Sequence, residues 1–70
     1  MTRAVQTEIR RLKRLHQSTE LELMLLTDRS VLTAADEAQL LALEQRKAQL
    51  AERIAWFESM LREHESVAAE

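Results

Sequence analysis

The segment TDRSVLTAADE, residues 27–37, decides the fold, because one helical pattern ends in it and another begins. Thr33 followed by Asp36 has the spacing of a capping box, in which a threonine hydroxyl accepts a hydrogen bond from an early backbone N–H group. Asp36 and Glu37 also place negative charge where the helix macrodipole favours it. We therefore expect a connection over residues 28–33 and a helix that begins directly after it.

Apolar residues on both sides of this segment recur in alternating steps of three and four, the heptad pattern of packed helices. The pattern predicts one helix over about residues 3–27 and another over about residues 34–65, followed by a frayed tail over residues 66–70. The first helix has no glycine cap, so we expect it to end in a frayed or 3₁₀-like turn. A short connection favours antiparallel neighbours. Residues 1–70 are therefore predicted to form one all-α domain, an antiparallel two-helix hairpin like a coiled coil.

The heptad positions of both helices define the seam along which they are expected to pack. One register brings the layers together and pairs Val5 with Phe57 and Ile9 with Ile54. The predicted seam residues are Val5, Ile9, Leu12, His16, Thr19, Leu23, Leu26, Leu40, Leu43, Lys47, Leu50, Ile54, Phe57 and Leu61.

Two polar residues interrupt this apolar seam, and the same register places them opposite each other. His16 would face Lys47, or could contact Glu20 one turn along its own helix. A single polar layer costs stability but penalises slipped registers. The alternative interpretation is a layer that responds to pH or binds a ligand.

Further apolar residues lie outside the seam, and a second apolar stripe implies a second interface. A symmetric dimer that forms a four-helix bundle would cover it, and so would an amphipathic helix of another protein. Small residues at Ala48 and Ala55 would let a helix approach closely, with Trp56 as anchor. The candidate interface residues are Leu21, Met24, Leu25, Leu41, Ala48, Ala55 and Trp56.

The composition speaks against an enzyme. The chain has no glycine for a phosphate loop and no cysteine, and a two-helix hairpin offers little concavity for a substrate. The Glu-x-x-His pattern of carboxylate-bridged metal sites fails at both histidines, since Lys13 precedes His16 and Leu61 precedes His64. We expect no catalytic residue, no cofactor, no metal site and no small-molecule substrate.

The sequence also predicts a cytoplasmic protein without a membrane partner. Its N-terminus has no continuous apolar stretch like that of a secretory signal. No segment approaches the roughly 20 apolar residues that a membrane-spanning helix needs.

A basic cluster, Arg10, Arg11, Lys13 and Arg14, lies mostly on the face opposite the seam. The plain interpretation is a solvated helix face in a chain whose net charge is −2. The alternative is a row of phosphate contacts, doubled in a dimer, as in small helical hairpins that bind RNA. No aromatic residue interleaves the cluster to stack on bases, which makes nucleic-acid binding the weaker interpretation.

The segments LKRLHQSTELEL and LLALEQRKAQLAERI resemble the YdcH-like proteins, small bacterial helical hairpins of unknown function. The resemblance covers about residues 12–54, and Glu44, Ala48 and Ala51 depart from the family's pattern. It implies a cytoplasmic hairpin and supplies no activity. The matching residues are Leu12, His16, Glu20, Leu23, Leu43, Lys47, Leu50, Glu52 and Ile54.

In size, composition and architecture the chain is also similar to the small hairpin co-chaperones that hold needle subunits of type III secretion systems. Three functional hypotheses follow. The first is a self-associating adaptor or structural protein that acts through protein–protein contacts. The second is a chaperone-like subunit that binds a partner's helix, and the third is an RNA-binding hairpin dimer.

Overall fold

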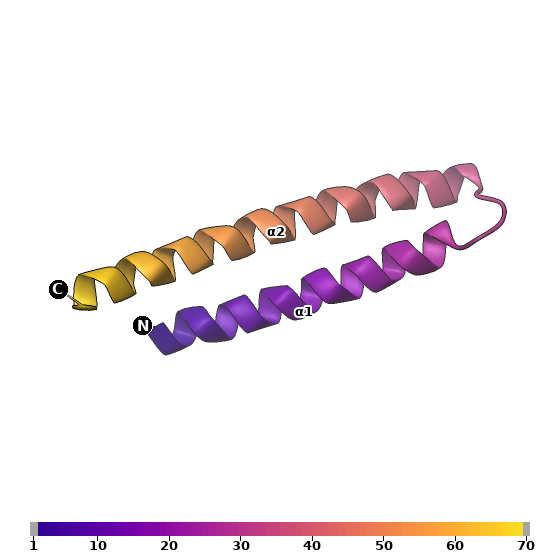
Figure 1. The fold of residues 1–70 in the computed structure, drawn as a ribbon. Helices are drawn as coiled ribbons and strands as arrows, with labels where there is room; N and C mark the ends of the chain where they lie inside the picture. The colour runs from indigo at the N-terminus through magenta and orange to yellow at the C-terminus, as the bar shows by residue number, and fades with distance from the viewer. Residues whose placement is uncertain (1, 70) are drawn as a thin grey trace.

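The computed structural model describes the backbone of residues 2–69 and the side chains of residues 2–65. This part of the chain contains two helices, α1 (Thr2–Thr27) and α2 (Ala34–Ala69), and no strand. The helices lie side by side and run in opposite directions, so both ends of the chain lie at one end of a rod (Figure 1). The principal extents of the rod are 57 × 14 × 14 Å. The predicted all-α helical hairpin is confirmed.

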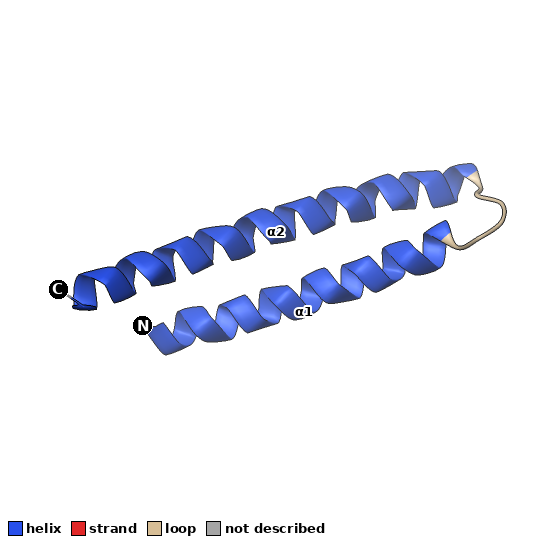
Figure 2. Ribbon diagram, viewed as in Figure 1, coloured by secondary structure: helices blue, strands red, loops and turns tan. Residues whose placement is uncertain are grey.

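The connection between the helices is short, and it is the loop shown in Figure 2. At its end the predicted capping box is formed. The Asp36 N–H donates to the Thr33 hydroxyl and the Thr33 N–H donates to the Asp36 carboxylate, each over 3.1 Å. These two bonds satisfy backbone donors that the first turn of a helix leaves without partners. The sequence therefore correctly predicts where α2 begins.

Arg29 adds an ion pair that the sequence analysis does not anticipate. Its Nη1 donates to Asp36 Oδ1 over 2.9 Å, which ties the start of the connection to the first turn of α2. The hydrogen bond from the Thr33 N–H to its carboxylate lowers the pKa of Asp36 below the ordinary value. The Thr33 hydroxyl and the Arg29 guanidinium lower this pKa further. The connection is thus fixed from both sides by one carboxylate.

α1 ends without a glycine, as expected, and its last carbonyls find other donors. The Asp28 N–H donates to Met24 O over 3.0 Å, and the Arg29 N–H donates to Leu26 O over 3.3 Å. The second bond spans three residues, which is the 3₁₀ spacing. The Thr27 hydroxyl also donates to Met24 O over 3.1 Å. The predicted 3₁₀-like ending is confirmed.

The predicted seam residues are all buried or half-buried, and the helices pack along this seam. Leu12 is only 2% exposed, and Ile9, Leu26, Leu43 and Ile54 complete the apolar core. The seam also includes one buried polar side chain, Thr19, which is likewise 2% exposed. Its hydroxyl donates to Leu15 O over 2.8 Å, so burial leaves no polar group of this side chain unsatisfied.

The register of the seam differs from the one predicted. At the open end of the hairpin, Val5 lines a pocket with Leu61 and Met60, together with Thr2 and His64. The prediction pairs Val5 with Phe57, one layer closer to the turn, and is wrong.

Heptad spacing explains the register that is formed. Counted upward from Val5 and downward from Leu61, the seam positions follow the same order of four-residue and three-residue steps. Each layer of one helix then stays level with a layer of the other. In the register that pairs Val5 with Phe57, every step of four on one helix would meet a step of three on the other.

The register also places the two polar seam residues, His16 and Lys47, in different layers. At helical spacing from the Val5–Leu61 layer, His16 lies level with Leu50 and Thr19 lies level with Lys47. His16 and Lys47 therefore occupy neighbouring layers, and the single polar layer that the sequence predicts is not formed.

The C-terminal part of α2 is longer than predicted. α2 continues to Ala69, whereas the sequence pattern places its end near Glu65. The frayed tail is predicted over residues 66–70; α2 includes residues 66–69, and Glu70 lies outside the described residues. The chain has no glycine or proline to stop the helix, and alanine is the strongest helix former.

Candidate interaction surfaces

His16, half-buried at the seam, contacts a carboxylate of its own helix. His16 Nδ1 lies 2.9 Å from Glu20 Oε1, and the two residues are one turn apart on α1. This is the contact predicted as an alternative for His16. Among the described residues, no group of three or more His, Cys, Asp or Glu side chains is placed to hold a metal ion. The pair lies at the edge of the seam, where His16 is half-buried and Glu20 is exposed.

Two residues of the basic cluster on α1 form ion pairs with carboxylates of the same chain, and the other two form none with a described side chain. Arg11 forms two bonds with Glu8, from Nη2 to Oε1 over 2.6 Å and from Nε to Oε2 over 3.0 Å. This contact lowers the pKa of Glu8 and raises the pKa of Arg11. Lys13 Nζ lies 3.4 Å from Glu58 Oε2 across the seam. Two of the four predicted phosphate contacts are thus engaged with carboxylates of the same chain.

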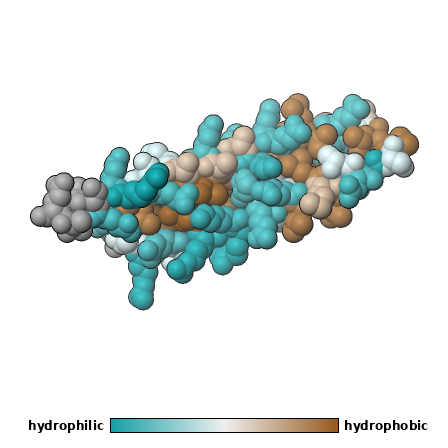
Figure 3. Space-filling model, in the orientation of Figure 1, coloured by the Kyte–Doolittle hydropathy of each residue, from teal (hydrophilic) through white to brown (hydrophobic). Residues whose placement is uncertain are grey.

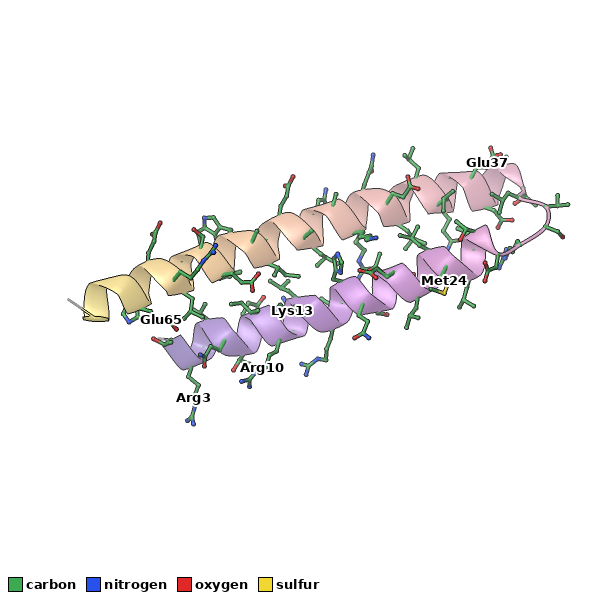
Figure 4. The ribbon with its side chains drawn as sticks, viewed as in Figure 1. Arg3, Arg10, Lys13, Met24, Glu37 and Glu65 are labelled. Carbon is green, nitrogen blue, oxygen red and sulfur yellow. The ribbon has the colours of Figure 1, made fainter. Side chains whose placement is uncertain are left out.

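Arg10 and Arg14 are exposed and form no ion pair with a described side chain. Arg3, which the sequence analysis does not single out, is placed in the same way. Arg3 and Arg10 project from α1 on the side away from α2 (Figure 4). Their spacing along the helix, seven residues from Arg3 to Arg10 and four from Arg10 to Arg14, would have revealed the shared face.

The same outward face of α1 becomes apolar toward the turn. Leu21, Met24 and Leu25 are 54%, 58% and 71% exposed, at spacings of three and four residues from Leu21. Leu21 lies nine residues beyond Leu12, about 2.5 helical turns, so it points directly away from the buried seam. α2 cannot cover this face, because it packs against the opposite one.

α2 also exposes apolar side chains on its outer face. Leu41 is 58% exposed, and Ala48 and Ala55 follow it at intervals of seven residues, both exposed. Trp56 is 59% exposed and rests edge-on against Phe57, with ring centroids 4.9 Å apart. All candidate interface residues predicted from the sequence are therefore exposed.

Apolar surface is concentrated near the turn. Figure 3 shows brown surface on both helices at that end, whereas hydrophilic side chains follow the lower edge of the rod toward the N-terminus. Val31, in the connection, is 77% exposed, and Leu32 beside it is half-buried. The rod thus has an apolar turn end and a charged open end.

Each helix has one row of residues on the face opposite the seam, and the two rows have the same spacing. The α1 outer row lies two and nine residues on either side of Leu12. The α2 outer row lies two and nine residues on either side of Ile54. The α1 outer row is Arg3, Arg10, Arg14 and Leu21, and the α2 outer row is Gln45, Glu52, Trp56 and Glu63. Every member of both rows is exposed.

Neither helix, over the described residues, is both long enough and apolar enough to cross a membrane. Comparison of the chain with protein-family models, with curated proteins and with solved structures gives no match.

Proposed function

We propose that this protein is a non-enzymatic helical interaction module of the cytoplasm, which associates with further copies of itself through the outer faces of its helices. The observation that carries the proposal is the exposure of Leu21, Met24 and Leu25 on the face of α1 directly opposite the seam. Scattered exposed apolar residues are common, but a contiguous row of large ones marks an interaction site.

Self-association is favoured over nucleic-acid binding by the state of the basic cluster. Arg11 and Lys13 are paired with Glu8 and Glu58, so they would have to exchange these partners for phosphates. The outer face of α2, with exposed Glu52 and Glu63, would repel a nucleic-acid backbone. The resemblance to YdcH-like hairpins agrees with a small helical module and adds no activity.

The test replaces the apolar face while keeping the helix. The variant Leu21→Gln/Leu25→Gln retains strong helix formers, and the matched control Val31→Ser removes an equally exposed apolar group outside the face. Sedimentation equilibrium over a concentration series gives the mass of each protein, and circular dichroism gives its helix content. We expect the double variant to associate less than the wild type, and the control to match the wild type.

The proposal fails if the wild-type chain is fully helical and stays at its monomer mass of 8.1 kDa at every concentration. That result would favour the hypothesis of a partner's helix on the same face. It also fails if the wild type associates and the double variant associates equally well, because the exposed leucines would then lie outside the interface.

A further inference from the structure

The two outer rows match each other in spacing and in chemistry when one of them is reversed. Reading up the α1 outer row, the intervals are seven, four and seven residues, and reading down the α2 outer row they are the same. The first row begins with three arginines, and the second row, read in the reversed order, begins with a glutamate, a tryptophan and a glutamate. These cations and these two carboxylates have no ion-pair partner among the described residues.

We propose that the α1 outer row of one copy packs antiparallel against the α2 outer row of a second copy. This inference rests on the proposed self-association and names the surfaces that perform it. Arg3 would pair with Glu63, and Arg14 with Glu52. Arg10 would lie over the Trp56 ring between them, a cation–π contact. Each of these contacts joins groups that are exposed in a single copy.

The apolar residues select the antiparallel direction. At the register set by the arginines, Leu25 of one copy is level with Leu41 of the next, and Met24 is level with the small residue Ala42. A parallel arrangement can match the same charges, since both pairs are separated by eleven residues. It would, however, leave Leu25 and Leu41 at opposite ends of the contact, both still in water.

The geometry makes this interface head-to-tail. On each helix the outer row lies opposite the seam, so a copy presents its α1 row to one neighbour and its α2 row to another. Such a heterologous contact does not close at two copies, but continues into a ring or an open array. The neighbour contributes the other half of every contact, so one copy alone has no complete site.

The register within one hairpin and the register between hairpins are the same. Leu12 and Ile54, the centres of the two rows, are level across the seam, and the proposed pairs are level across the interface. Neighbouring hairpins would therefore lie side by side without axial displacement, and their turn ends would align.

The experiment uses two charge-reversed variants of the full chain. The first, Arg3→Glu/Arg14→Glu, makes the α1 outer row acidic, and the second, Glu52→Arg/Glu63→Arg, makes the α2 outer row basic. Each variant alone places like charges across the contact, and we expect its association to weaken by about tenfold or more. Mixed in equal amounts, the acidic α1 row of one meets the basic α2 row of the other, and association returns to the wild-type level.

Controls separate this effect from net charge. Arg46→Glu/Arg62→Glu and Glu22→Arg/Glu44→Arg change the charge of the chain by the same amounts at exposed positions outside both rows. We expect both controls to associate like the wild type, and all four variants to keep the helix content measured by circular dichroism.

The pairing of the outer rows can fail while self-association stands. If the wild type associates but either charge-reversed variant keeps the wild-type mass, the outer-row pairing is wrong and self-association stands. Loss in both variants without recovery on mixing also overturns the pairing. If the wild type remains a folded monomer, both proposals fail. A single-stranded RNA oligonucleotide could instead bind the wild type and not Arg3→Glu/Arg14→Glu, with neither protein self-associating. The arginines would then be a nucleic-acid-binding site, and both proposals would be wrong.

Discussion

At the scale of single residues, the Asp36 carboxylate holds the connection between the two helices in place. Asp36 accepts bonds from the Thr33 N–H and from Arg29, while the Thr33 hydroxyl accepts the Asp36 N–H. Because these bonds join the end of one helix to the start of the next, they fix the point where the chain reverses. Changes at these residues should therefore act on the hairpin as a whole.

Replacing Thr33 by alanine removes one half of the capping box. We expect the free energy of unfolding to fall by about 1 kcal/mol, the usual cost of losing an N-cap side chain. Urea unfolding followed by circular dichroism measures it. Ser30→Ala, a loss of another exposed hydroxyl in the same connection, is the matched control and should leave the midpoint unchanged. An equal fall in both variants would mean that the cap contributes nothing specific.

The pKa of Asp36 predicts a dependence of stability on pH. Its folded-state pKa is lowered from 3.8, so the folded state holds this proton more weakly than the unfolded state. The stabilisation is present above pH 3.8 and is lost as the pH falls through the lower folded value. We expect the urea midpoint of the wild type to fall in that acid range, and the midpoint of Asp36→Asn to fall less. Equal acid sensitivity in the two proteins would contradict this assignment.

At the scale of the elements, the buried face of each helix determines stability and the outer face does not. Leu12→Ala opens a cavity at a site that is 2% exposed, and we expect a loss of about 2–5 kcal/mol. Leu25→Ala removes the same atoms from a side chain that is 71% exposed. Urea unfolding at low protein concentration, where association does not contribute, should show a loss below about 0.5 kcal/mol for Leu25→Ala. Similar losses in both would contradict the seam as placed here.

The register of the two helices can be tested with disulfides, since the natural chain has no cysteine. Val5→Cys/Leu61→Cys places two thiols in one seam layer, and we expect it to oxidise readily to an intramolecular disulfide. Val5→Cys/Phe57→Cys places them in different layers and should oxidise slowly, because the bond requires Cα atoms about 4.4–6.8 Å apart. Gel mobility with and without reductant reports both. Faster oxidation of the second variant would favour the register that the sequence analysis predicts.

The sequence predicts this fold well wherever the information is local. The capping-box spacing of Thr33 and Asp36 predicts the start of α2. The intervals of three and four residues between apolar positions identify the buried face of both helices. The register is harder to predict, because the same heptads can pair at more than one offset. Only the order of the steps, matched from Val5 and from Leu61, separates the offsets. The ion pair between Arg29 and Asp36 depends on how the connection bends, which no spacing in the sequence encodes.

The surfaces are predictable to a similar degree. Helical spacing alone identifies the exposed apolar residues, because they lie away from the seam. It does not show that Arg11 and Lys13 are occupied by carboxylates, since Glu58 reaches Lys13 only after the helices have packed. The basic cluster therefore looks more available in the sequence than it is in the folded chain, where Arg3, Arg10 and Arg14 form the accessible row.

At the scale of the whole molecule, the hairpin is a thin rod with one layer of core. A small domain of this kind buries little apolar surface alone, and copies that cover each other's outer faces would bury more. Association would then stabilise the fold by mass action, so the melting temperature should rise with protein concentration. The charged pairs at the open end would specify which faces meet, and the leucines near the turn would supply apolar contact.

The most direct test of this central claim is the molar mass of the wild-type protein in solution, measured by light scattering over a concentration series. We expect a mass that rises above 8.1 kDa and passes twice that value, because head-to-tail contacts do not stop at two copies. A fully helical protein that remains at 8.1 kDa at every concentration would contradict it.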